Sequence, residues 1–124
     1  MNVVEATTVS SAATTIDSFA TTAYTGAFYV FTGYNATEGA ASISEVMVVA
    51  NDEAYISAGP ILSTKGTDQL TFTASLSGQT VTVQAASTSG SSTIVNAYRV
   101  HMLRGSAGAS TADTVLVSTE QTVT

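Results

Sequence analysis

Alternation of apolar and hydroxyl-bearing residues is the feature that most restricts what this chain can fold into. Within residues 70–76 every second residue is apolar, and the residues between them are Ser or Thr. A period of two places the apolar side chains on one face of a β-strand and the hydroxyls on the other. The pattern resumes at Val81, Val83 and Ala85 after a turn over residues 77–79, which predicts a β-hairpin.

Other segments predict further strands on either side of this hairpin. Residues 24–31 are aromatic and β-branched and predict a central strand buried on both faces. Residues 42–50 predict a second strand, followed by a short one over residues 54–58. Proline has no backbone N–H to donate, so Gly59-Pro60 should end that strand or place it at a sheet edge.

The chain as a whole predicts an all-β fold in one domain. Residues 93–103 form a long alternating segment, so about seven or eight short strands fall within residues 1–104. Charged residues make up only 10% of the 124 positions, whereas Ser and Thr account for 16 and 22 of them. This composition suits strands and turns rather than a helical bundle. The pattern is that of an antiparallel β-sandwich or a closed barrel, and we expect the sandwich.

The last twenty residues differ from the rest. Residues 105–113 are mostly Gly, Ser and Ala without apolar periodicity, which predicts a flexible linker. Val115 and Val117 then belong to a short strand-like segment. A strand on a flexible arm can add to its own sheet or to that of a neighbour, so residues 105–124 are a candidate subunit-contact arm.

Charge and cysteine content exclude several classes of partner and site. Three basic residues against nine acidic ones give a net charge of −6, so we expect no binding to nucleic acid or to anionic membranes. The absence of cysteine excludes disulfides and thiolate metal ligands. The N-terminus lacks the pattern of a signal peptide and no apolar run approaches a membrane span, so we expect a soluble product made inside the cell.

Residue patterns for catalysis or cofactor binding are weak. His101 is the one histidine, and a triad with Ser and Asp17, Asp52 or Asp68 is formally conceivable, but the Gly-x-Ser-x-Gly elbow is absent. Residues 51–53 lack the spacing of a calcium loop, and residues 59–67 lack the second glycine of a phosphate loop. We therefore expect no enzyme activity, no cofactor and no metal.

The basic residues are concentrated in one place. Arg99, His101 and Arg104 fall within six positions on the predicted strand 93–103. One interpretation is a strand edge that charge protects from aggregation. The other is a subunit contact, in which Arg99 or Arg104 pairs with a carboxylate of a neighbouring chain. The candidate carboxylates for that pairing are Glu5, Asp17 and Glu45. We expect His101 to be a strand side chain on the same face as Arg99, either solvated or at a contact.

The order of these short segments resembles a module of structural proteins of tailed bacteriophages, marine and cyanobacterial ones in particular. The resemblance covers roughly residues 12–104. The segments that carry it are 16–19, 23–24, 27–29, 45–49, 54–56 with Gly59, 70–74, 76–78, 81–83 and 98–100.

The resemblance implies a virion component with a β-sandwich fold and no catalysis. Because the module is nearly the whole chain, we expect a head decoration (cement) protein, bound to the major capsid protein or another virion protein and self-associating. It would be assembled in the host cytoplasm and reside on the head surface. The alternatives are a tail, neck or tail-fibre protein, or a glycan- or receptor-binding module that uses the turn residues Tyr34 and Tyr55.

Overall fold

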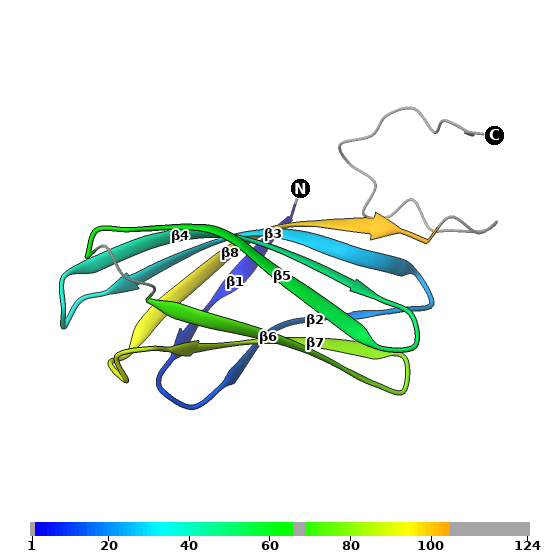
Figure 1. The fold of residues 1–124 in the computed structure, drawn as a ribbon, viewed down its shortest axis with the longest axis horizontal. Coiled ribbons are helices and arrows are strands. Elements are labelled where there is room, and N and C mark those ends of the chain that lie inside the picture. Colours follow the sequence, from blue (N-terminus) through cyan, green and yellow to red (C-terminus); the bar gives the residue numbers. More distant parts are fainter. Residues whose placement is uncertain (1, 66–68, 105–124) are drawn as a thin grey trace.

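The computed structural model describes residues 2–65 and 69–104, and for residues 2–6 and Pro60 it describes the backbone alone. In these residues eight strands form two antiparallel sheets that face each other (Figure 1), so the all-β sandwich prediction is confirmed. None of the described segments is a helix that could cross a membrane. The strands are β1 (Asn2–Val9), β2 (Thr14–Ala20), β3 (Tyr24–Asn35), β4 (Ala40–Ala50), β5 (Ala54–Ser63), β6 (Leu70–Ser77), β7 (Thr80–Ser87) and β8 (Thr93–Leu103).

The two sheets differ in size. The large sheet has the order β1-β8-β3-β4-β5, and the small sheet has the order β2-β7-β6. In Figure 1 the large sheet forms the upper layer and the small sheet the lower one. Strand β8 is the last described strand in the sequence but lies between β1 and β3, so the large sheet joins both ends of the described chain.

Most predicted strands are found, although β3 and β5 extend beyond their predicted ends. The β6–β7 hairpin and the bounds of β8 agree with the alternation, and Gly78 in the hairpin turn has a φ of 60°. Strand β5 does not end at Gly59-Pro60 but continues to Ser63, with a register shift against β4 near these residues. Because β5 is an edge strand, the alternative prediction for the proline, a sheet edge, is the one confirmed.

Strand β3 is central, as expected, but it is not buried on both faces. Tyr29 and Phe31 point between the sheets and are fully buried, whereas Phe28 and Val30 on the opposite face are half-buried and Tyr34 is exposed. A two-layer sandwich covers only one face of each sheet. The apolar residues on the other face of β3 therefore lie on the outside of the molecule.

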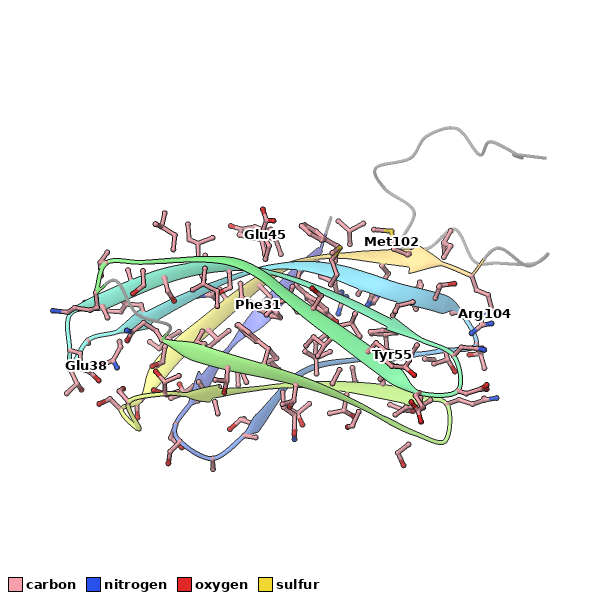
Figure 2. All side chains as sticks on the ribbon, viewed as in Figure 1. Phe31, Glu38, Glu45, Tyr55, Met102 and Arg104 are labelled. Atoms are coloured by element: carbon pink, nitrogen blue, oxygen red, sulfur yellow. The ribbon has the colours of Figure 1, made fainter. Side chains whose placement is uncertain are left out.

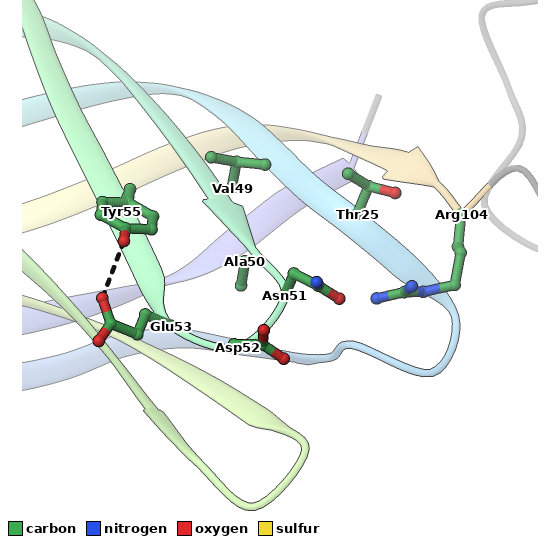
Figure 3. A pocket seen from close by; sticks show the side chains of 8 residues that line it. All are labelled: Thr25, Val49, Ala50, Asn51, Asp52, Glu53, Tyr55 and Arg104. Atoms are coloured by element: carbon green, nitrogen blue, oxygen red, sulfur yellow. Dashed lines mark hydrogen bonds between the residues drawn. The ribbon is translucent and has the colours of Figure 1, made fainter.

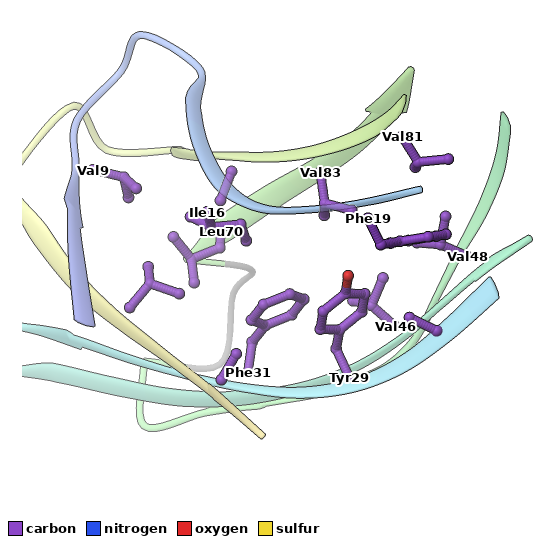
Figure 4. Packing of buried hydrophobic residues seen from close by; sticks show 14 of the residues in the cluster. Val9, Ile16, Phe19, Tyr29, Phe31, Val46, Val48, Leu70, Val81 and Val83 are labelled. Carbon is purple, nitrogen blue, oxygen red and sulfur yellow. The ribbon is translucent and has the colours of Figure 1, made fainter. Parts of the chain in front are cut away.

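The core lies between the sheets and contains a short aromatic stack. The rings of Tyr29 and Phe31 (Figure 4) are 4.9 Å apart between centroids, and those of Phe31 and Phe72 are 4.8 Å apart. Phe72 comes from the small sheet, so this stack links the two layers. Valine side chains from both sheets surround it, among them Val46, Val48, Val81, Val83 and Val95. Such β-branched side chains pack well on a pleated surface.

Gly26 allows β3 and β4 to lie close together at one end of the large sheet. A Cβ atom at this position would lie 2.2 Å from the carbonyl oxygen of Val48. No side chain can be accommodated there without a backbone shift. The glycine thus leaves a gap on the outer face of the sheet, between its cross-strand neighbours Val49 and Met102.

Candidate functional site

Asp17 of β2 forms the centre of a buried polar network between the two sheets. Its Oδ1 accepts a hydrogen bond from Arg99 Nη1 at 2.7 Å, and its Oδ2 accepts one from Tyr29 Oη at 2.6 Å. The Asp17 side chain is only 7% exposed. Tyr29 and Arg99 are paired residues on β3 and β8, so one carboxylate of the small sheet binds both strands of the large sheet.

His101 lies beside this network within an aromatic enclosure. Its Nε2 is 4.0 Å from Asp17 Oδ2, and its side chain is 5% exposed. The imidazole ring lies 4.2 Å from the ring of Tyr24 and 5.3 Å from that of Phe19, between centroids. Aromatic rings from β2 and β3 therefore separate His101 from solvent.

Burial and Asp17 together keep the Tyr29 phenol protonated. Desolvation raises the pKa of Tyr29 far above its ordinary value, and the hydrogen bond to Asp17 and the negative charge of that carboxylate raise it further. The positive charge of Arg99 acts in the opposite direction but is the smallest of these effects. Tyr29 therefore acts as a neutral hydrogen-bond donor to Asp17.

These positions correct the interpretation of the basic cluster. Strand β8 lies between β1 and β3, and Arg99 is paired on both sides, so the charged-edge interpretation is wrong for Arg99. Arg99 and His101 alternate with outward-facing residues and point between the sheets, so His101 is not solvated. Arg99 pairs with Asp17, one of the three carboxylates expected from a neighbouring chain, but the pairing is within the same chain. Arg99 and Asp17 thus link the two sheets within one chain.

Arg104, the third member of the cluster, ties the end of β8 to the turn between β2 and β3. Its Nε donates a hydrogen bond to the Thr21 carbonyl oxygen at 2.7 Å, and its backbone N–H donates to the Ala23 carbonyl oxygen at 3.0 Å. The remaining candidate contacts, Val115 and Val117, lie outside the described residues, as does the whole arm over residues 105–124.

A hollow of about 670 Å³, lined by both polar and apolar residues, lies at this end of the large sheet (Figure 3). Arg104 points toward Asn51 of the β4–β5 turn, whereas Glu53 of the same turn is directed toward Tyr55. Tyr55 Oη donates a hydrogen bond to Glu53 Oε2 at 2.8 Å, and this bond is the main cause of the raised pKa of Tyr55. No histidine lines the hollow, and among the described residues no three His, Asp or Glu side chains gather as metal ligands would.

The outer face of the large sheet is the most unusual surface of the described molecule. Nine large apolar side chains that are 45–75% exposed lie on it, and cross-strand pairing places them side by side. Figure 2 shows Met102 on this outer side, whereas Phe31 points between the layers. The nine residues are Tyr34, Ile43, Met47, Val49, Tyr55, Leu62, Ile94, Tyr98 and Met102. We call this surface the apolar face.

The apolar face is larger than the apolar patches commonly found on monomeric soluble proteins. Nine side chains, each about half exposed, amount to on the order of 900 Å² of apolar surface, whereas a monomer's largest patch is commonly about 300–600 Å². The small sheet is different, because its outer face carries mostly Thr, Ser and Gln, for example Thr73 opposite Gln84 and Ser75 opposite Thr82. The sandwich therefore has one polar side and one apolar side.

Two apolar hollows lie at opposite ends of this face. The first, about 420 Å³, is lined by Phe28, Met47 and Met102 around the gap at Gly26. The second, about 590 Å³, is lined by Tyr34, Ile43, Leu62 and Ile94 among others. The face is therefore not flat but can receive side chains of another molecule at both ends.

Sequence reasoning did not identify the apolar face, although a signal for it was present. The segment Val46-Met47-Val48-Val49 is apolar at consecutive positions, which indicates a strand that is apolar on both faces. For residues 24–31 of β3, a similar apolar run led us to expect burial on both faces. Within the described residues, the eight strands in two layers leave the outer face of the large sheet without a covering layer.

Comparisons with protein-family models, with curated proteins and with solved structures find no match to this chain.

Replacing Asp17 with Asn should destabilise the fold strongly. The substitution keeps the shape of the side chain but leaves the Arg99 guanidinium without its counter-charge between the sheets. We expect a loss of about 3 kcal/mol in the free energy of unfolding, measured by urea denaturation at neutral pH. The control is Glu45→Gln, an exposed position where a change within about 0.5 kcal/mol is expected. Equal losses in the two variants would contradict the assigned role of Asp17.

Alkaline pH should also weaken the fold through Tyr29. In the unfolded chain its pKa returns to about 10, so the folded state holds this proton more tightly. The resulting stabilisation is complete below pH 10 and is lost as the pH rises toward the raised folded-state pKa. Above pH 10 we expect the free energy of unfolding to fall by about 1.4 kcal/mol per pH unit from this group. Urea denaturation across that range should give a shallower slope for Tyr29→Phe; parallel slopes would refute the assignment.

Proposed function

We propose that this protein is a non-enzymatic structural subunit of a tailed-bacteriophage particle, bound to the head surface as a decoration protein. The observation that carries the proposal is the apolar face, on the order of 900 Å² of exposed apolar side chains on one side of a rigid sandwich. Specific protein interfaces bury about 800 Å² on each partner. The face therefore has the size of one side of a stable interface.

The internal use of the polar residues supports a structural role. The one histidine and one of the two arginines lie between the sheets, and the other arginine binds backbone carbonyl groups of a turn. These groups hold strands in place. The sequence resemblance to virion modules indicates that the assembly is a phage particle. On that particle, the polar outer face of the small sheet would be the side exposed to water.

A protein of the tail, neck or fibre could bind its partner through the same apolar face. The immunogold experiment described below distinguishes these locations from the head. The glycan-binding alternative gains no support, because Tyr34 and Tyr55 do not form one platform. Val49 of β4 pairs with both Tyr55 and Gly26, so Tyr55 is level with Gly26 across the sheet. Gly26 is eight residues from Tyr34 along β3. At the usual rise per residue that is roughly 26 Å, too far for both rings to stack on one sugar.

Immunogold electron microscopy on intact particles of the encoding phage tests this proposal. We expect gold label distributed over the head at many sites per particle. Label confined to the tail or neck would support the alternative location instead. Absence of label from every particle, with the protein detected in the infected cell by the same antibody, would overturn the virion role.

A further inference from the structure

Glu45 is the one charged residue among the described side chains of β3, β4, β5 and β8 that face outward on the large sheet. It is exposed and lies opposite Val30 of β3, in a row between those of Met47 and Ile43 (Figure 2). The two apolar hollows lie on either side of this row. A single carboxylate thus lies near the middle of an otherwise uncharged surface.

We propose that the apolar face docks onto a protein surface that is itself apolar and carries a basic side chain opposite Glu45. This inference rests on the proposed function and specifies the chemistry of the partner. Burying the face would bring Glu45 out of water, and an unpaired buried carboxylate is strongly unfavourable. An arginine or lysine on the partner would satisfy it, and arginine would do so with two hydrogen bonds.

A second copy of this chain fits the face poorly. Its described cations are Arg99, which is paired with Asp17, Arg104, which binds the Thr21 carbonyl oxygen, and Lys65, which follows the end of β5. None of them lies on the apolar face. Two such faces packed together would bury two carboxylates with no cation supplied by either face, and each chain also carries a net charge of −6.

The hollows add a shape requirement to the charge requirement. One hollow is lined by Met47 and Met102 and the other by Ile43 and Leu62, with Glu45 between them. The complementary surface would place apolar side chains on both sides of its basic residue. The apolar contacts supply most of the affinity, and the charge pair selects the partner and its orientation.

Methionine oxidation reports directly on whether the face is covered. Met47 and Met102 are about half exposed in the free chain, so dilute hydrogen peroxide should oxidise both readily. On purified particles we expect oxidation of both to slow at least tenfold, measured by mass spectrometry of tryptic peptides. The matched control is Thr73→Met, an exposed reporter on the outer face of the small sheet, which should remain reactive on the particle.

The charge is tested by Glu45→Gln, with Asp52→Asn in the β4–β5 turn as the control carboxylate off the face. Purified variants are added to particles assembled without this protein. We expect Glu45→Gln to bind at least tenfold more weakly than the wild type, and Asp52→Asn to bind with an unchanged Kd. Equal binding of both variants would overturn the proposed basic partner.

The outcomes separate this inference from the proposed function. Absence of the protein from particles overturns the virion role, and the docking inference with it. Presence on particles with Met47 and Met102 as reactive as in the free chain overturns the docking inference alone. Analytical ultracentrifugation of the full chain tests for self-association. A monomer supports binding to a different protein. A dimer that Glu45→Gln strengthens would show that a second copy occupies the face, and would overturn the proposal.

Discussion

The arrangement of the two sheets depends on the hydrogen bonds that Tyr29 and Arg99 of the large sheet donate to Asp17 of the small sheet. Apolar burial brings the sheets together, but it is non-directional and would tolerate several relative positions. The hydrogen bonds from Tyr29 and Arg99 to the two oxygens of Asp17 are satisfied only where β2 lies across β3 and β8 as observed. A displaced sheet would leave a charge buried and unpaired, which costs far more than imperfect apolar packing. The aromatic stack and the valine core then fill the space that this alignment defines.

The consequences reach the outside of the molecule. With Arg99 and His101 of β8 pointing between the sheets, the strands of the large sheet have few charged residues left for their outer face, and most positions there are apolar. The small sheet instead presents hydroxyls and amides to water. This difference between the two sides is what a subunit that lies flat on a larger assembly needs, because one side must leave water and the other must remain in it.

Sequence patterns predicted part of this structure, and the limits have physical causes. The β6–β7 hairpin and β8 followed from alternation, because the period of two is a local property. Strands β1 and β2 were not located by that signal, since both contain register shifts that interrupt it. Arg99 was recognised as a paired residue, but its partner depends on how two sheets stack across 82 positions of sequence. The sequence also could not show which face of β4 is covered. The segment Val46-Met47-Val48-Val49 places apolar side chains on both faces of the strand.

We propose that the outer face of the large sheet is the surface by which this protein binds the particle. A cryo-electron microscopy reconstruction of the particle at side-chain resolution tests it most directly. We expect the large sheet to face the particle, with apolar side chains of the partner in the hollows and an arginine or lysine within hydrogen-bond distance of Glu45. A reconstruction with the hydroxyl-rich small sheet against the particle, and with Met47 and Met102 in solvent, would contradict it.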